Sequence, residues 1–310
     1  MSFFEDILDS STTVGKVAYA ITFAFLGWFL ITAAVAGTLL YSLVKPEVRG
    51  ADLRDSDLFS KPELITVQAA GGKPRDGWFF PGLTTSPTII LCHGYQGHKG
   101  DIITMVSSLQ KDRFNVFVFD FSGHGRAPGA TTLGPGETKE LLAAIDVILK
   151  RTDVDQTRVG VWGFDMGAYA ALSAALADPR VKAVAADSVY DQPRTFFELL
   201  ARRADISKVP LSVTFARWGY SMMNWGARND PPLSQRVAAL RETSKLFVQG
   251  QDNPALAEST LQLFLRSPEP RKQAVFPKSN YATMIEEERK AYETEVVHFF
   301  LAALPPAISQ

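Results

Sequence analysis

The stretch "GFDMG", residues 163–167, places one carboxyl residue, Asp165, between two glycines. The preceding "RVGVWG" has the apolar, β-branched composition of a strand, and the following "AYAALSAALA" is typical of a helix. A carboxylate at such a strand-to-helix turn has two chemical uses. It can attack a substrate carbon as a nucleophile. It can also stay a buried anion that the N–H groups of its own helix N-terminus stabilise.

The elements that must position Asp165 form a repeating pattern. Short apolar runs, each ending in a Gly, small or acidic residue, alternate with helical patterns such as "GETKELLAAIDVILKR". This alternation predicts an α/β fold with a mostly parallel central sheet covered by helices on both faces, whose sites form at the strand C-termini. The first two runs, "ELITVQ" and "DGWFFPG", are expected to form an antiparallel opening pair. The runs of the parallel part are "PTIILCHG", "NVFVFDFSG", "RVGVWG", "VKAVAADS" and "SKLFVQG".

The composition divides the chain into an N-terminal apolar part and one globular domain. Residues 45–62 are polar and bounded by prolines, so they are interpreted as a linker. The domain is expected over residues 63–303, followed by a tail over 304–310. Within it, residues 191–243 break the alternation with a helical, aromatic segment that includes "FARWGYSMMNWGARNDPP". We interpret this segment as a cap-like insertion over the site entrance, the alternative being an insertion that packs at the periphery.

The segment Val17–Val44 contains 28 residues without a charge. A helix of this length exceeds the hydrocarbon core of a bilayer, which is about 30 Å thick, and tilting would absorb the excess. The long run and acidic start favour a retained transmembrane helix over a signal peptide. The basic residues that follow it predict a single-pass protein with a cytoplasmic domain. Residues 1–16 are expected to be an N-terminal tail, for which a small interfacial helix and a partner contact are the two interpretations.

The composition also limits the classes of partner and cofactor. Basic residues number 32 and acidic residues 33, which gives no reason to expect a nucleic-acid partner. The single Cys92 excludes an internal disulfide and a cysteine-based zinc site. The four histidines are dispersed, so neither a metal site nor another cofactor is expected. The partners expected are the lipid bilayer and, as a further possibility, another integral membrane protein or complex.

Five motifs in a fixed order resemble the α/β-hydrolase superfamily, and the resemblance covers essentially the whole chain. They are "LCHGYQGHKGD", "FDFSGHGRAPG", "GFDMGAYAAL", "AADSVYDQP" and "LFVQGQDNPA". The chain looks closest to bacterial members with one N-terminal transmembrane helix. The resemblance implies the fold, with a nucleophile, a histidine base, an acid that orients it and backbone donors for an oxyanion.

The resemblance assigns the oxyanion donors to the backbone N–H groups of Tyr95 and Met166. The "HG" and "SGHG" histidines, His93 and His124, have a structural role in such loops. Of the other two histidines, His98 is expected to be solvated on a polar loop, and His298 to be structural on the C-terminal helix. No histidine is therefore expected to act as the catalytic base.

The remaining catalytic positions depart from the family pattern. The nucleophile position holds Asp165. The acid position after "LFVQG" holds Asn253, with Asp252 one residue early. The position of the histidine after the last strand holds Tyr281, or Asn280 with a shift of one residue. These departures indicate degenerate catalytic residues, with Tyr281 non-functional as a base.

An Asp at this turn also occurs in haloalkane dehalogenases and epoxide hydrolases, which form an ester that a His-activated water then hydrolyses. Those dehalogenases resemble one another in a Trp after the Asp, where this chain has Met166. The first hypothesis is a membrane-anchored pseudohydrolase that serves as a binding or structural subunit. The alternatives are a membrane-anchored hydrolase with Asp165 as nucleophile, of ester, haloalkane or epoxide type, and a non-catalytic binder of a small apolar ligand.

Overall fold

A computed structural model describes residues 11–47, 61–68, 74–84, 86–227, 229–278 and 281–305. Most of the N-terminal tail and of the linker predicted from sequence, together with Asn280, therefore lies outside the described residues. The contacts divide the chain into two units, one of Met1–Leu43 with Phe197–Trp225 and the other of Val44–Phe196 with Gly226–Gln310. The second unit contains the sheet.

The sheet has eight strands in the order β1-β2-β4-β3-β5-β6-β7-β8. The pairs β1–β2 and β2–β4 are antiparallel and all others are parallel, which confirms the predicted opening pair and mostly parallel sheet. The strands are β1 (Glu63–Gln68), β2 (Pro74–Phe80), β3 (Thr88–Cys92), β4 (Asn115–Phe119), β5 (Val159–Phe164), β6 (Val181–Asp187), β7 (Ser244–Gly250) and β8 (Arg271–Phe276).

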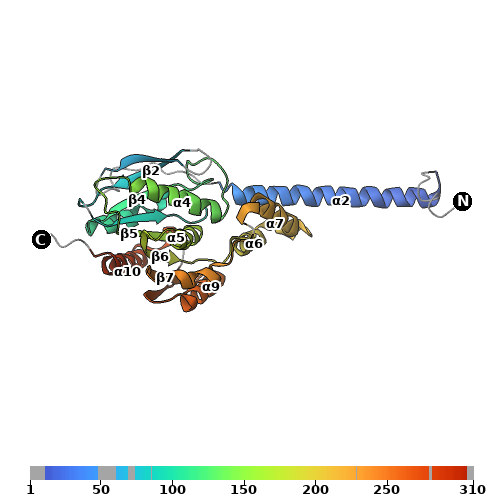
Figure 1. The fold of residues 1–310 in the computed structure, drawn as a ribbon. Helices are drawn as coiled ribbons and strands as arrows, with labels where there is room; N and C mark the ends of the chain where they lie inside the picture. The colour runs from blue at the N-terminus through green and yellow to red at the C-terminus, as the bar shows by residue number, and fades with distance from the viewer. Residues whose placement is uncertain are drawn as a thin grey trace. The chain divides into compact units, whose positions relative to one another are not determined.

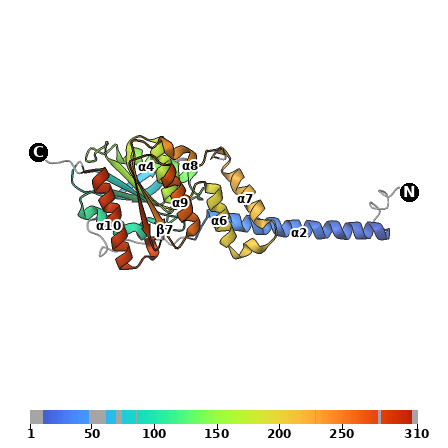
Figure 2. The same ribbon diagram turned by 90° about the horizontal axis from the view of Figure 1, so that it is seen from below.

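Helices cover both faces of this sheet (Figure 1, Figure 2). One face packs on α3 and α10, and the other packs on α4, α5 and α9. In the sheet unit the helices are α3 (Ile103–Lys111), α4 (Pro135–Ile148), α5 (Met166–Ala177), α8 (Leu233–Arg236), α9 (Pro254–Arg266) and α10 (Glu286–Ala303), with the 3-10 turns η2 (Lys99–Ile102), η5 (Val237–Ala239) and η6 (Tyr281–Thr283).

The strand sequences explain why both faces are covered. In β3, Ile89 and Leu91 join the core beneath α3 and α10, while Ile90, which points to the opposite face, is equally buried. In β7, the ring of Phe247 contacts the ring of Phe264 on α9, with centroids 6.1 Å apart. Continuous apolar runs of this kind are typical of parallel strands buried on both faces.

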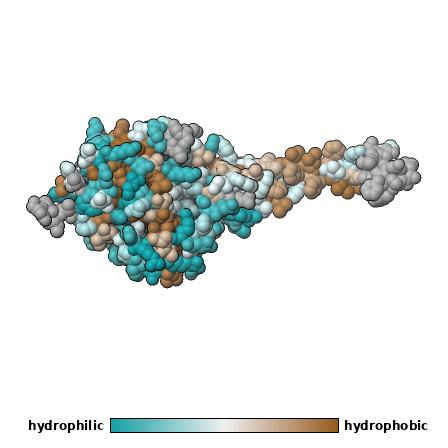
Figure 3. Space-filling model, viewed as in Figure 1, coloured by the Kyte–Doolittle hydropathy of each residue, from teal (hydrophilic) through white to brown (hydrophobic). Residues whose placement is uncertain are grey.

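The other unit is built on the long helix α2 (Thr13–Val44). Its side chains are largely apolar and exposed, as the brown surface along α2 in Figure 3 shows. The unit also contains α6 (Pro193–Arg203) from Phe197 onward, η3 (Asp205–Lys208), α7 (Ser212–Met223) and the first residue of η4 (Trp225–Ala227). The segment that clusters with α2 is thus shorter than the insertion expected over residues 191–243.

Candidate active site

Asp165 occupies the tight turn between β5 and α5, and Met166 is the first residue of the helix, as expected from the sequence. Its backbone has φ 37° and ψ −97°, a conformation that a residue other than glycine rarely adopts. The flanking glycines are required by close packing. A Cβ on Gly163 would lie 2.3 Å from the carbonyl of Gly167, and one on Gly167 would lie 2.3 Å from the carbonyl oxygen of Cys92.

The two backbone N–H groups assigned to an oxyanion hole converge on one point, and a carboxylate oxygen lies at that point. Oδ1 of Asp165 accepts a hydrogen bond of 2.7 Å from the N–H of Tyr95 and a second, short one from the N–H of Met166. The loop after β3 can approach this closely because Gly94 has no side chain. A Cβ there would lie 3.0 Å from Oδ1 of Asp165 and 2.3 Å from the ring of Phe164.

The electrostatics of Asp165 follow from its surroundings. The residue is 7% exposed, and burial raises its pKa to about 7, although the hydrogen bonds from Met166 and Tyr95 act in the opposite direction. No cation is among the groups that shift this pKa. Two peptide dipoles and the helix N-terminus therefore stabilise the charged form only in part.

A second buried carboxyl group, Asp187, was not among the residues singled out in the sequence. It ends β6, is fully buried, and its Oδ1 and Oδ2 accept hydrogen bonds of 2.8 Å from the hydroxyls of Ser188 and Tyr292. Tyr292 in turn accepts a bond of 2.9 Å from Nε1 of Trp162. The backbone N–H of Asp165 donates to the carbonyl of Asp187 at 2.9 Å, so the two residues are neighbours at the sheet edge.

Burial raises the pKa of Asp187 to about 8, and the negative charges of Asp165 and Asp252 act in the same direction. The sequence signal that would have found it is an acidic residue at the C-terminus of the strand beside the turn. Asp187 stands in the motif "AADSVYDQP", whose residues were not expected to have a chemical role.

The two acid candidates lie between β7 and α9. Asn253 is the N-cap residue of α9, without a side-chain capping bond, and Asp252 is exposed. The negative charge of Asp252 contributes to the raised pKa of Asp187. The structure thus brings acidic residues from the ends of β5, β6 and β7 to one edge of the sheet.

Tyr281, at the position of the family histidine, is buried and bonded to groups other than Asp165. Its hydroxyl lies 2.6 Å from Oγ1 of Thr104 and donates a short hydrogen bond to Glu293 of α10. The other oxygen of Glu293 accepts a bond of 2.6 Å from Ser108. Burial, followed by the charge of Glu293, raises the pKa of Tyr281 well above its usual value, so this phenol stays protonated at neutral pH.

The histidines of the two glycine-containing loops have structural contacts. Nδ1 of His93 bonds the carbonyl of Gly94 at 2.8 Å, and its Nε2 accepts the N–H of Phe121 at 3.0 Å. Burial lowers the pKa of His93 to about 3, so the neutral ring ties the loop after β3 to the loop after β4. Nδ1 of His124 bonds the carbonyl of Ser122 at 3.1 Å, while its buried Nε2 has no hydrogen-bond partner in the described part of the chain.

The other two histidines lie on different elements. His298 is exposed on α10. The side chain of His98 was expected to be solvated, and this expectation is wrong, because its side chain is only 14% exposed. Its Nδ1 accepts the N–H of Gly100 at 3.0 Å and caps η2, a role that a polar loop sequence does not reveal. All four histidines are in the described part of the chain, and none has a hydrogen bond to Asp165 there.

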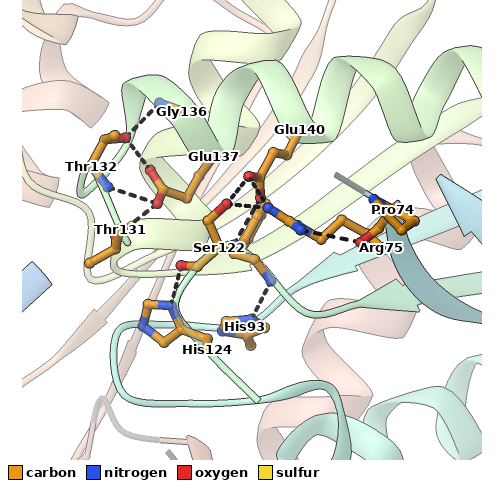
Figure 4. A network of polar contacts seen from close by, with 11 residues as sticks. Pro74, Arg75, His93, Ser122, His124, Thr131, Thr132, Gly136, Glu137 and Glu140 are labelled. Carbon is orange, nitrogen blue, oxygen red and sulfur yellow. Dashed lines mark hydrogen bonds and ion pairs between the residues drawn. The ribbon is translucent and has the colours of Figure 1, made fainter. Parts of the chain in front are cut away.

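A polar network supports the site from the side of α4 (Figure 4). Glu137 accepts the N–H groups of Thr132 and Gly134 at 3.0 and 2.7 Å, which caps the helix and fixes the preceding loop. Thr131 in that loop places its Oγ1 2.7 Å from Glu137 and 3.1 Å from the sulfur of Met166. The network thus extends to the residue that follows Asp165.

A cavity of about 260 Å³ lies beside the turn. Its walls include the loop 93–97 together with Trp162, Phe164 and Tyr281. Among the described residues, Phe164 lines this cavity and Asp165 does not. The carboxylate of Asp165 instead bonds the N–H groups of Tyr95 and Met166. Over the same residues, no group of three His, Cys, Asp or Glu side chains has a geometry that would hold a metal ion.

Comparisons with known proteins agree with this geometry. Residues 87–282 match the model of the alpha/beta hydrolase fold family. The chain is 25% identical over 254 residues to the uncharacterized protein YfhR of Escherichia coli K12, which covers 79% of this chain and 82% of YfhR.

Solved structures are similar at lower sequence identity, and this likeness concerns the fold alone. The esterase Pf2001 of Pyrococcus furiosus superposes with a TM-score of 0.67 at 20% identity, covering 84% of this chain and all of the esterase. The α/β hydrolase GrgF of Penicillium sp. sh18 superposes with a TM-score of 0.61 at 16% identity, covering 79% and 99%. With the fold, the turn and the matched segment in agreement, the chain belongs to the alpha/beta hydrolase fold family.

Proposed function

We propose that this chain is a membrane-anchored α/β-hydrolase-fold protein. Its folded domain serves as a binding or structural subunit of a membrane assembly and does not turn over substrates. The observation that carries the proposal is the capture of Oδ1 of Asp165 by the N–H groups of Tyr95 and Met166. In a serine hydrolase these donors receive the oxygen that becomes negative during acyl transfer. Here the donors already bond an oxygen of the protein.

The energetic consequence is large. Loss of a single oxyanion donor costs an acyl-transfer enzyme about 2.7–4 kcal/mol of transition-state stabilisation. At this turn both donors are engaged, and an ionised Asp165 adds a negative charge that repels a developing oxyanion. The group at the position of the base is a phenol bonded to Glu293 and Thr104, and a protonated phenol is a poor base at neutral pH.

The same observation favours one second candidate, an Asp165 nucleophile. In the described structure both hydrogen bonds to this carboxylate end on Oδ1, and Oδ2 is the oxygen that would attack. Attack on a haloalkane carbon would form a C–O ester bond as the carbon–halogen bond breaks and halide leaves. Water must then hydrolyse that ester, a step that a base accelerates. Without such a base, each chain reacts at most once.

Intact-mass measurement combined with a turnover assay separates the two candidates. Wild type, Asp165→Asn and Asp165→Ser are each offered short acyl esters, haloalkanes and epoxides, with the exposed Asp146→Asn as a matched control. We expect no multiple turnover by any variant, and at most one adduct per wild-type chain. Multiple turnovers by wild type and Asp146→Asn that vanish in Asp165→Asn would refute the binding proposal and support an Asp nucleophile.

The anchor in this proposal is α2. Its 32 residues are long and apolar enough to cross a bilayer, and side chains such as Ile21, Phe23 and Phe25 are more than half exposed. Part of α2 also packs on a later segment of the chain, which supports a retained helix over a removed signal. The basic residues after α2 support a cytoplasmic domain. A binding domain held at a membrane would act on another membrane protein, and such a partner remains part of the proposal.

A further inference from the structure

We propose that α7 is a second membrane element, which inserts its exposed apolar face into the same bilayer leaflet as the C-terminal half of α2. This inference rests on the proposed role of α2 as the anchor. The face consists of Trp218 and Met222 of α7, with Leu211 at its N-cap. The occupant we assign to this face is lipid.

The first step is the packing of α7 on α2 within one unit. The ring of Phe215 contacts the ring of Phe29 edge-on, with centroids 6.0 Å apart. A Cβ on Gly219 would lie 2.8 Å from Cδ2 of Leu40, so the backbone of α7 comes close to α2 at this point. Both views of the ribbon place α7 alongside α2 (Figure 1, Figure 2).

The second step is the depth of that contact. A hydrocarbon core is crossed by about 20 helical residues. Every stretch of that length within the charge-free segment Val17–Val44 contains Phe29. Phe29 therefore lies at the level of the lipid chains wherever the bilayer is centred on this segment. Phe215, which touches it, lies at that level too, and α7 is a helix of only 12 residues around it.

The third step is the chemistry of the outward face. Trp218 is 67% exposed, Met222 50% and Leu211 50%. Leu211, Trp218 and Met222 are spaced by seven and four residues and so share one side of the helix. Ala216 and Tyr220 are buried on another side, where Tyr220 stacks on Phe197 of α6 at 4.5 Å. Large apolar faces of this kind are costly in water, and Trp favours the edge of a bilayer.

The charge of the segment is complementary to a lipid surface. Within Phe197–Trp225 the basic residues Arg202, Arg203, Lys208 and Arg217 outnumber the acidic residues Glu198 and Asp205, although the whole chain has a net charge of −1. Arg202 and Arg203 lie at the end of α6 and both are exposed. Basic residues beside an inserted apolar face strengthen binding to membranes that contain anionic lipids.

Depth-dependent fluorescence quenching of the full chain tests this inference. Met222→Cys and Trp218→Cys are labelled with an environment-sensitive fluorophore and reconstituted in phosphatidylcholine–phosphatidylglycerol vesicles. The native Cys92 is buried and does not compete for the label. Phe23→Cys on α2 serves as the anchor control, and Gln262→Cys on the exposed side of α9 as the aqueous control.

We expect labels at positions 222 and 218 to be quenched by lipids carrying a quencher on the acyl chain, about threefold more than the label at position 262. Soluble iodide should act mainly on position 262. If positions 218 and 222 behave like 262 while position 23 is quenched by lipid, the inference about α7 is overturned and the anchor stands. If position 23 also escapes lipid quenching, the proposed anchor fails, and the inference about α7 fails with it.

Discussion

Asp120 and Asp165 are both buried, and each follows directly after a strand, but their partners differ. Asp120, after β4, is 4% exposed and accepts Nζ of Lys99 at 2.5 Å and the N–H of the same residue at 2.8 Å. Asp165, after β5, is 7% exposed and, among the described residues, accepts hydrogen bonds from two backbone N–H groups and from no cation. The two carboxyl groups are alike in burial and in their position after a strand. They differ in the ammonium group of Lys99, which bonds Asp120 and has no counterpart at Asp165 among the described residues.

This difference sets the charge of each group. Burial alone would raise the pKa of Asp120, but the charge and hydrogen bonds of Lys99 reverse this and the net pKa is lowered. At Asp165 the two N–H groups do not offset burial, and the pKa rises to about 7. The two peptide dipoles thus hold the Asp165 carboxyl group in place, whereas the buried cation keeps Asp120 ionised.

The largest effect should come from removing that cation. Lys99→Met leaves the charge of Asp120 buried without its partner, and removes a cation that lies 4.7 Å from the ring of Trp78. We expect a loss of about 3–5 kcal/mol in the free energy of unfolding, measured by denaturant titration of the full chain in detergent. Lys290→Met, which breaks an exposed pair with Glu286, is the control and should change nothing measurable. Equal effects of the two variants would show that the buried cation is not what distinguishes Asp120.

The next effect concerns the dependence of stability on pH. The pKa of Asp165 rises from about 3.9 in the unfolded chain to about 7 in the folded one, so its contribution to stability is present below pH 4 and lost as pH rises through 7. Asp165→Asn keeps an oxygen for the two N–H groups but cannot ionise. We expect it to exceed wild type in stability by about 1–4 kcal/mol at pH 8 and to match it near pH 4.

The matched variant Asp120→Asn should behave in the opposite way. Because the pKa of Asp120 is lower in the folded chain than in the unfolded chain, this group stabilises the fold at every pH above its unfolded pKa. That stability is lost only as the pH falls through the pKa of the folded chain. Asp120→Asn should therefore be most destabilised, relative to wild type, near neutral pH. Unfolding free energies measured from pH 2 to 8 check both variants, because the contribution of Asp120 is lost only below about pH 4. Parallel curves for wild type and Asp165→Asn would contradict the raised pKa.

The smallest effect is expected at Tyr281. Tyr281→Phe removes a hydroxyl that bonds Glu293 and Thr104, and leaves Glu293 with its bond from Ser108. We expect a loss of about 1–2 kcal/mol in unfolding free energy, with the pH dependence of stability from Asp165 unchanged. Any turnover detected for the wild type should also persist, because Tyr281 is not the base in our proposal. A loss of turnover without a loss of stability would return Tyr281 to the catalytic group.

The sequence predicted the turn at Asp165 and most of the strands, because these depend on residues that are close together in the chain. The glycines around Asp165 predicted the turn, since only residues without a side chain allow β5, α5 and the end of β3 to approach so closely. Apolar runs predicted strands β3 to β7, because strands of a covered parallel sheet bury both faces. The role of Asp187 escaped prediction, because its partner Tyr292 lies 105 residues away on α10.

What the sequence alone determined is therefore the set of elements, the family resemblance and the identity of the residues at each catalytic position. Only the tertiary structure decided what those residues touch. In the fold, a carboxylate oxygen of Asp165 accepts the two N–H groups that were expected to form the oxyanion hole. The hydroxyl of Tyr281 bonds Glu293. Helix α7 packs on α2 through Phe215 and Phe29, which are far apart in the sequence. The physical reason is that hydrogen-bond partners, burial and helix contacts depend on segments remote in sequence, and these set both the pKa of a carboxyl group and the face that a helix leaves exposed.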